Sequence, residues 1–469
     1  MTLLMSTLHF LAAYSLTWIS YTGPVLESVD TPLRVPPTKA QMNFVTSVML
    51  LGSIVSSLAT GQLPELLGRK KTELIAGLIC ALAWALIVTA KSINQMLAAR
   101  FLMGFGCGIH FVVIMTYINE ISQSFIRGTM ASIPLFSFSI GCLVSYITGW
   151  VCSYEVIGYL NLSTCVLFVV LVNFLKESPV YLISKKQDKE ALAALQFYRG
   201  DSKATVAVLE EFEHLKKQQE SSMYAEIGTD EVLENNDSRE EKDIATGSKE
   251  MSPWKTLVTS KSTQRGIIVL TTHIVLSCFM GSSAVQAYAG HFFLAAAPDI
   301  SPHLCSVILA VAIVAGNAIA VLGTDLFGRR VLMISSCAVC TICLAVLVTL
   351  LRWSWAPDWA VPLVMLLYPC AFQAGVQNVP MVQLSECFMP NVKGIASSIV
   401  ITCNGLSCFV LLSVFGVLVE LLGLDGTFLL FCTISALTTV LAFFTVKETK
   451  GIPLEEIQAM YERGYFYWQ

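Results

Sequence analysis

Two short stretches of charged residues carry the first chemical signal in this chain. Each places an acid three positions before a glycine, with two basic residues after it: Glu65 before Gly68-Arg69-Lys70, and Asp325 before Gly328-Arg329-Arg330. Glycine permits a tight turn, and the basic side chains can contact helix-terminal carbonyl groups and acids of neighbouring helices. The chemistry indicated is ion pairing that can form and break. Because the same loop recurs at equivalent places in the two halves of the chain, it also indicates an internal duplication.

Residue patterns for enzymatic chemistry are missing from the sequence. It contains no glycine-rich nucleotide cradle and no nucleophile motif. Cys337, Cys340 and Cys343 have a spacing similar to that of metal ligands, but they lie in an apolar run without histidine. A buried helix face is therefore favoured over a zinc site. We expect no enzyme activity, no metal and no cofactor, and no basic groove indicates nucleic acid.

Composition assigns the chain to the integral membrane proteins. Its 469 residues are 55% hydrophobic and only 13% charged, whereas soluble domains carry about 25% charged residues. Half of the charged residues lie between residues 176 and 265. On each side of this polar linker, the apolar sequence has room for six membrane helices of about 20 residues.

The predicted fold is an all-α membrane protein with twelve transmembrane helices in two six-helix bundles, residues 1–175 and 266–446. A linker, residues 176–265, joins them, and a tail, residues 447–469, follows. Since the first apolar run has no basic flank and no cleavage site, it is interpreted as a retained span. Lysine and arginine in the short loops favour both termini in the cytoplasm. The predicted spans are residues 3–22, 43–64, 72–90, 96–118, 129–151, 156–175, 266–294, 304–326, 331–351, 361–384, 394–420 and 426–446.

The linker is predicted to hold short cytoplasmic helices. Residues 189–198 form one amphipathic pattern, and residues 204–218 form a second, with Val206, Leu209, Phe212 and Leu215 on one stripe. Residues 221–252 are acidic and poor in aromatics, which predicts a mobile segment and leaves open an unknown cytosolic partner. The alternative is a simple solvated linker.

The two charged loops resemble the signature of the major facilitator superfamily, and further stretches are similar to its sugar porter family. This similarity covers nearly the whole chain. The sequence also resembles insect facilitated trehalose transporter-like proteins. The resemblance implies two bundles that rock around a central solute site. The stretches that carry it are Arg100-Phe101-Leu102-Met103-Gly104, Tyr117-Ile118-Asn119-Glu120, Arg127-Gly128, Lys176-Glu177-Ser178-Pro179, Glu386-Cys387-Phe388-Met389-Pro390, Lys393-Gly394 and Glu448-Thr449-Lys450-Gly451.

The resemblance further implies a cytoplasmic gate, an ion-pair network between the two halves that is made when the transporter faces outward. An unpaired carboxylate at a span end is expensive, so breaking and remaking such pairs would bias a two-state rocking motion. The alternative is static anchoring of helix ends. The implied gate residues are Glu65, Arg69, Glu120, Arg127, Glu177, Asp325, Arg329, Arg330, Glu386 and Lys393.

The solute site departs from the family pattern. Sugar porters carry Gln-Gln-x-x-Gly-x-Asn on the seventh helix, but the aligned stretch here has Ser277, Cys278 and Ser283 instead of the amides. Met381 and Gly405 replace two tryptophans. Because a buried hydroxyl without a partner costs about 1–3 kcal/mol, we expect low sugar affinity. The remaining binding candidates are Gln286, Tyr288, Gln377, Asn378 and Asn404.

The leading functional hypothesis is a transporter of a small neutral polar solute, with a hexose or trehalose as first candidate, in the plasma membrane. Residues 3–22 contain no acid, whereas a proton-coupled member of the resembled family would be expected to carry one there, so facilitated diffusion is favoured. Two alternatives remain: a transporter of a non-sugar solute, and a sensor of the same fold that does not transport. The expected partners are the solute and the lipid bilayer.

Overall fold

The computed structural model describes residues 2–29, 31–59, 63–123, 127–200, 205–206, 208–217, 257, 259–289, 301–353, 355–357, 359–388, 390–452 and 454–465. Within these ranges the regular structure is entirely helical, which confirms the predicted all-α class. The side chains of Arg127, Asp325 and Lys393 lie outside the described part of the chain.

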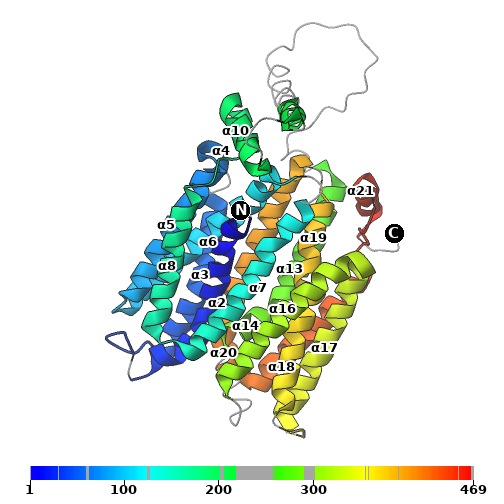
Figure 1. The fold of residues 1–469 in the computed structure, drawn as a ribbon. Coiled ribbons are helices and arrows are strands. Elements are labelled where there is room, and N and C mark those ends of the chain that lie inside the picture. The colour runs from blue at the N-terminus through cyan, green and yellow to red at the C-terminus, as the bar shows by residue number, and fades with distance from the viewer. Residues whose placement is uncertain are drawn as a thin grey trace, which may run out of the picture.

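The helices form two bundles with smaller helices at one end (Figure 1). The N-terminal half consists of α1 (Thr2–Met5), α2 (Thr7–Glu27), α3 (Lys39–Ala59), α4 (Leu63–Leu67), α5 (Arg69–Val88), α6 (Ile93–Ile121), α7 (Arg127–Val151) and α8 (Tyr154–Val172). The linker contributes α9 (Pro179–Ser184) and α10 (Asp188–Arg199). The C-terminal half consists of α13 (Lys261–Phe279), α14 (Ser282–Ala287), α16 (Pro302–Phe327), α17 (Arg329–Trp353), α18 (Ala360–Ala371), η1 (Phe372–Gln377), α19 (Asn378–Glu386), α20 (Pro390–Thr445) and the terminal α21 (Leu454–Arg463).

Eleven helical segments of the described chain are long and apolar enough to cross a membrane. The last, Ile395–Thr445, has 51 residues, more than twice what one crossing needs. Gly423 interrupts it with φ 73° and ψ 174°, values outside any helix. The chain therefore turns there, α20 contains two spans, and the described helices supply the twelve predicted crossings.

Three predicted spans differ from the observed helices. The first was expected to end at Gly23-Pro24, but α2 continues to Glu27 with Pro24 inside it. Membrane helices tolerate proline because neighbouring groups satisfy the carbonyl that it leaves free. The seventh span breaks at Gly281, where φ is 90°. The tenth contains the π-helix η1. Both breaks lie beside residues predicted to bind solute.

Helices α3 and α6 are packed backbone against backbone. A Cβ atom on Gly104 would lie 1.7 Å from the Met49 carbonyl oxygen, and one on Gly52 would lie 2.2 Å from that of Phe101. Such close approach through small residues is a common way for helices to associate in lipid.

The linker helices dock on the N-terminal half. Arg199 at the end of α10 donates to the Ile121 carbonyl at 2.8 Å, and the Tyr117 hydroxyl donates to the Lys176 carbonyl at 2.5 Å. The predicted helix over residues 189–198 is thus confirmed as α10. Residues 221–252 lie outside the described residues.

The apolar stripe predicted for residues 204–218 is partly wrong. Phe212 is buried and Leu215 packs beside it, as expected, but Val208 supplies the next buried contact. Val206 is 72% exposed and Leu209 is 42% exposed. The helix is rotated relative to the prediction because its buried face is chosen by α9 and α10, which contribute Leu182, Ala191 and Leu195 to the same cluster.

The C-terminal helix α21 docks in a corresponding way on the C-terminal half. Arg265 of α13 donates to the Glu462 carbonyl at 2.6 Å. Lys447, only 1% exposed, donates to the Gly464 carbonyl at 2.8 Å. The end of the molecule that carries α4, α10 and α21 is called the linker side below (Figure 1).

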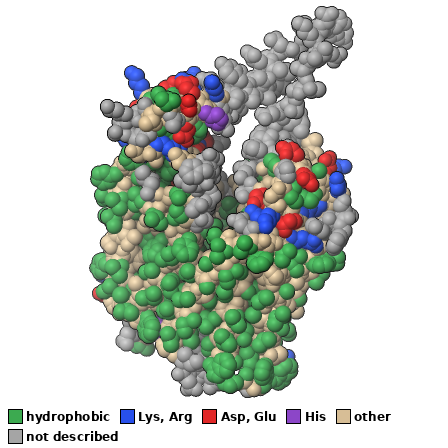
Figure 2. Space-filling model, turned by 45° about the vertical axis from the view of Figure 1, so that its right-hand side comes forward, with side chains coloured by type: hydrophobic (Ala, Val, Ile, Leu, Met, Phe, Trp, Pro, Cys, Tyr) green, Lys and Arg blue, Asp and Glu red, His purple; other side chains and the backbone are tan. Residues whose placement is uncertain are grey.

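Polar contacts between the two halves lie away from the linker side. The Tyr146 hydroxyl of α7 donates to the Gln286 carbonyl at 2.6 Å, and Tyr288 donates to Asn43 of α3 at 3.2 Å. Figure 2 shows the contrast: apolar side chains, in green, cover both halves on the face shown, and a notch separates their two charged ends on the linker side. In this conformation the halves meet at the far side and are parted at the linker side.

Candidate functional site

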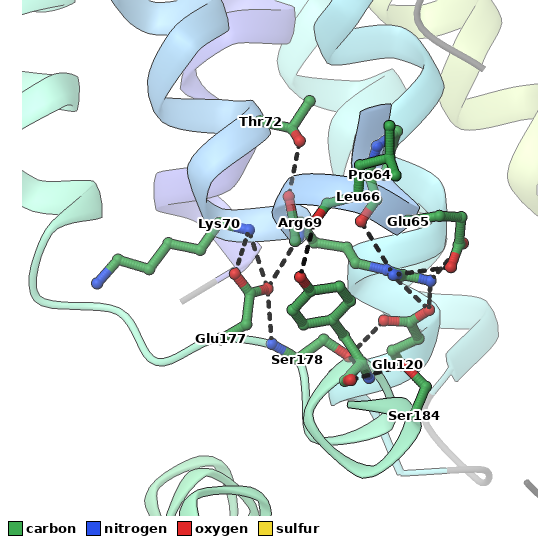
Figure 3. A network of polar contacts seen from close by, with 12 residues as sticks. Pro64, Glu65, Leu66, Arg69, Lys70, Thr72, Glu120, Glu177, Ser178 and Ser184 are labelled. Carbon is green, nitrogen blue, oxygen red and sulfur yellow. Dashed lines mark hydrogen bonds and ion pairs between the residues drawn. The ribbon is translucent and has the colours of Figure 1, made fainter. Parts of the chain in front are cut away.

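The N-terminal half has a charge network at its linker side (Figure 3). Arg69, the first residue of α5, forms ion pairs with Glu65 at 2.8 Å and with Glu120 at 2.9 Å. Its guanidinium also donates to the Pro64 carbonyl at 3.1 Å, and its side chain is 6% exposed. One buried cation thus joins α4, α5 and the end of α6.

A second acid of this network binds main-chain groups. The Glu177 carboxylate accepts the backbone N–H groups of Arg69 at 2.9 Å, Lys70 at 3.0 Å and Ser178 at 2.9 Å. The Ser178 hydroxyl donates to Glu120. Glu177 therefore lies at the free N-terminus of α5, where a helix favours negative charge.

The C-terminal half repeats most of these contacts. Arg329, the first residue of α17, pairs with Glu386 at 2.7 Å. Glu448 accepts the backbone N–H groups of Arg329 at 2.9 Å and Arg330 at 3.1 Å. The Thr449 hydroxyl donates to Glu386 at 2.6 Å, as Ser178 does to Glu120. The internal duplication predicted from the loops is thus present as a duplicated network.

A glycine is required where each carboxylate meets its helix. Gly68 has φ 94° and Gly328 has φ 85°, values that side-chain-bearing residues rarely adopt. A Cβ atom on Gly68 would also lie 2.4 Å from a Glu177 oxygen, and one on Gly328 would lie 2.5 Å from a Glu448 oxygen. The glycines predicted to permit a turn also make space for an acid.

The acids of these networks differ in how firmly they hold their charge. Burial raises the pKa of the Glu120 carboxyl, although Arg69 and Ser178 act in the opposite direction. Burial would also raise the pKa of Glu448, but hydrogen bonds from backbone N–H groups outweigh it and lower that pKa. Glu448 is therefore a fixed negative charge, whereas Glu120 accepts a proton more readily.

The predicted gate residues are brought together in two groups. Glu65, Arg69, Glu120 and Glu177 meet in one half, and Arg329, Arg330 and Glu386 meet in the other. The ion pairs of Arg69 and Arg329 each stay within one half, so the network between the halves remains a prediction for an outward-facing state. Sequence reasoning missed Glu448 as a network member. Its signal was Lys-Glu-Ser at residues 176–178 repeated as Lys-Glu-Thr at 447–449.

Two of the predicted solute-binding residues lie at the contact between the halves. The side-chain amide of Gln286, a residue that is 6% exposed, donates to the Ser282 hydroxyl at 3.3 Å. Tyr288 stacks on Phe415 with ring centroids 4.9 Å apart while it donates to Asn43. In this conformation both help to close the far side.

The other predicted binding residues lie on η1, α19 and α20. Asn378 donates to Asn317 of α16 at 2.7 Å, and Asn317 donates to Ser139 across the halves. Asn404 accepts a hydrogen bond from the Cys278 thiol at 3.0 Å, and Gln377 is half-buried. Sequence reasoning missed Asn317, whose signal was a lone amide in an apolar span.

Comparisons with known proteins agree with this architecture. Residues 1–461 match the family described as "Sugar (and other) transporter". The chain belongs to this transporter family. As a family member it is similar to the sugar transporter ERD6-like 16 of Arabidopsis thaliana, with 28% identity over 95% of this chain and 87% of that protein. It is also similar to the facilitated trehalose transporter Tret1 of Polypedilum vanderplanki, with 25% identity over 94% and 83%.

Solved structures show the same fold for this sugar-transporter family member. The inward-open conformation of the xylose transporter XylE from E. coli superposes with a TM-score of 0.75, with 98% of each chain covered and 20% identity. A second XylE structure, bound to 6-bromo-6-deoxy-D-glucose, gives a TM-score of 0.71 at 21% identity. The protein is thus a multi-pass membrane transporter of the major facilitator fold, as the loops predicted, and not an enzyme.

Proposed function

We propose that this chain moves a small neutral sugar, with trehalose or a hexose as first candidate, by facilitated diffusion through alternating access. The observation that carries the proposal is the distribution of polar contacts between the halves: Tyr288 with Asn43 and Tyr146 with Gln286 close the far side, while the ion pairs of the linker side stay within each half. Similarity to sugar and trehalose transporters supports the solute class.

The same contacts define what must change in the opposite state. An outward-facing state requires the two far-side hydrogen bonds to break and the two linker-side networks to approach. Rigid-body rocking of two bundles about a central site accomplishes both. Because each half carries its own linker-side caps, α10 on one and α21 on the other, these can move with their bundles.

Uptake by the purified full-length protein in liposomes tests the proposal. We expect saturable uptake of labelled trehalose or glucose with a KM in the millimolar range, because Ser277, Cys278 and Ser283 replace amide partners. Losing two hydroxyl partners at about 1–3 kcal/mol each weakens affinity by roughly thirtyfold to twenty-thousandfold. Tyr288→Phe, which removes the bond to Asn43 but keeps the stack on Phe415, should change the rate more than KM.

Three other outcomes would revise or replace this proposal. Micromolar glucose affinity would mean that the lost amides are compensated, and the argument from the departures would fail. Saturable uptake of a non-sugar solute from a wider panel would favour the alternative transporter. The feature that favours a non-sugar solute is the pair Cys278 and Cys408, whose sulfur atoms are 3.3 Å apart beside Asn404. If no solute enters, the chain is a sensor.

We also propose that the linker side faces the cytoplasm of the cell and that the protein resides in the plasma membrane. Arg69, Lys70, Lys71, Arg329 and Arg330 gather at that side, as the positive-inside rule requires. An epitope tag at either terminus should therefore be detected only after cells are permeabilised. Staining of a terminal tag on intact cells would reverse the orientation.

A further inference from the structure

A chain of three titratable side chains crosses the interior of the N-terminal half, apart from the gate and the solute candidates. The Glu73 carboxylate of α5 lies 2.9 Å from Nδ1 of His110 on α6. The other ring nitrogen of His110, Nε2, lies 2.6 Å from Nδ1 of His9 on α2. Glu73 and His110 are 0% exposed and His9 is 5% exposed.

Burying these three titratable side chains inside the membrane costs free energy, which indicates that they serve a function. All three residues belong to segments that cross the membrane, where ionisable groups are rare and mark ion pathways or proton relays. Packing alone would be served by apolar side chains of similar volume. The aromatic ring of Phe111 covers His9, with ring centroids 4.7 Å apart, so the unit is shielded as well as buried.

The geometry selects a proton as the ligand. Two imidazole nitrogens that share a metal ion each lie about 2.0–2.1 Å from it, which keeps them about 3 Å or more apart. The 2.6 Å between His9 and His110 leaves space for a single hydrogen. No group of three or more metal-ligand side chains with metal geometry occurs in the described residues.

Glu73, His110 and His9 can together gain or lose one proton while both hydrogen bonds between them are kept. With Glu73 protonated, it donates to Nδ1 of His110, whose Nε2–H donates to His9. With the proton moved to His110, the same two contacts remain and the net charge is still zero. When the Nε2 proton of His110 passes to Nδ1 of His9 and His9 releases its own Nε2 proton, Nδ1–H of His110 still donates to the carboxylate. His110 Nε2 then accepts from Nδ1–H of His9, and the net charge is minus one.

Few other charges face this unit. Glu73 acts electrostatically on Cys80 of its own helix and on Tyr117 of α6, while Cys107 from α6 and Cys165 from α8 face Cys80. The remaining titratable groups on the elements packed around the unit are Arg69, Lys70 and Lys71 on α5, Tyr14, Tyr21 and Glu27 on α2, Arg100 and Glu120 on α6, Lys39 on α3, Glu65 on α4, Arg127, Cys142 and Tyr146 on α7, Tyr154, Glu155 and Tyr159 on α8, and Tyr181 on α9.

Glu73 is placed to influence the linker-side network. It follows Arg69 by four residues on α5, and such neighbours on a helix have Cβ atoms about 6 Å apart. An ionised Glu73 would therefore compete with Glu120 for the Arg69 guanidinium, whereas a protonated Glu73 would not. His9 connects the same unit to α2, a helix that packs against α14 of the other half.

We propose that Glu73, His110 and His9 form a proton-binding site inside the N-terminal bundle, and that its occupancy sets the transport rate. The site is separate from the solute site, and its effect on rate rests on the transport function proposed above. The protonated unit is neutral and leaves Arg69 to Glu120. The deprotonated unit places a negative charge among α2, α5 and α6, and uptake falls.

Infrared difference spectroscopy of the purified full chain in lipid nanodiscs tests the site without any solute. Between about pH 5 and about pH 9, we expect a C=O stretch of a protonated carboxyl that disappears as pH rises. Glu73→Gln should remove this band, and His110→Gln or His9→Gln should shift its midpoint. His273→Gln is the matched control, because His273 is equally buried but hydrogen-bonds a backbone carbonyl of its own helix, that of Val269.

Uptake measured over the same pH range tests the consequence. We expect the wild-type and His273→Gln rates to fall by about threefold or more as pH rises, and the Glu73→Gln rate to stay nearly constant. A wild-type spectrum in which neither this band nor the imidazolium bands of His110 change with pH, or a pH profile shared by wild type and Glu73→Gln, would overturn the inference. If the band is present and no solute is taken up, the transport proposal fails and the proton site stands.

Discussion

Gly68→Ala and Gly328→Ala are expected to lower the amount and the thermal stability of folded protein more than any other single methyl addition in the linker-side loops. At φ 94°, ψ 161° and φ 85°, ψ 165°, a residue with a side chain bears strain of about 1–3 kcal/mol. The added Cβ atom would also overlap the carboxylate of Glu177 or Glu448. The combined effect should exceed about 3 kcal/mol of unfolding free energy.

Gly200→Ala gives a lower bound for the conformational cost, because Gly200 has a left-handed helical ψ and not the extended ψ of Gly68 and Gly328. Gly200 ends α10 with φ 76° and ψ 15°, and no atom lies within 4 Å of the position that an added Cβ atom would take. It should show the conformational cost alone, about 1 kcal/mol. Thermal unfolding of the three variants in detergent makes the comparison. If Gly68→Ala is no more destabilising than Gly200→Ala, the carboxylate does not occupy the space assigned to it.

Glu120→Gln and Arg329→Ala are expected to reduce transport by about tenfold while surface expression remains close to normal. Glu120→Gln removes one acid from Arg69 but leaves Glu65 in contact with it. Arg329→Ala leaves Glu386 with the Thr449 hydroxyl. Both networks stay partly bonded, so the fold should survive. The outward-facing state should be weakened in each variant, because it is the state in which the networks of the two halves approach.

An ion pair within the linker provides the control for charge removal. Lys216 and Asp188 lie 2.5 Å apart with side chains 33% and 45% exposed, and such solvent-accessible pairs contribute little. Lys216→Gln should therefore leave transport unchanged. Reactivity of a cysteine introduced near the linker side reports which state is populated. Unchanged transport and unchanged reactivity in Glu120→Gln and Arg329→Ala would mean that the networks only anchor helix ends.

The charge networks could be predicted in part because their signals are local. A glycine flanked by an acid and two basic residues can be read within one loop, and Glu65 with Arg69 indeed forms an ion pair four residues apart. Glu448 was different. It lies 119 residues along the chain from the Arg329 backbone N–H that it binds, and this contact could be inferred only by comparing residues 447–449 with residues 176–178.

The solute candidates were harder to place because their positions depend on breaks that helical periodicity does not report. Gly281 breaks the seventh span with φ 90°, and a Cβ there would lie 2.3 Å from the Phe431 ring. That ring belongs to a segment 150 residues away in sequence. The break rotates Gln286 and Tyr288 toward the other half, whereas a continuous helix would have pointed them elsewhere.

The position of the linker helix over residues 205–217 shows the same limit. When a helix contains many apolar residues, its sequence fits more than one choice of buried face. The predicted stripe contained Val206 and Leu209. In the structure Val208 instead belongs to the buried cluster that includes Ala191 and Leu195 of α10. The choice between faces depended on a partner helix that the pattern within this segment does not contain.

The main-chain grip on Glu177 and Glu448 has a consequence for natural variation. Every residue except proline presents a backbone N–H, so replacing Lys70, Arg330 or Lys450 leaves these particular contacts intact. Substitutions at those three positions should keep the contacts with the glutamate and lose only the side-chain hydrogen bonds to the Asn173, Phe443 and Leu326 carbonyls. Proline there, or any change of the glutamate itself, should break the contacts with the glutamate. A natural variant that exchanges one of these basic residues is therefore expected to have a milder effect on the protein than its charge change suggests.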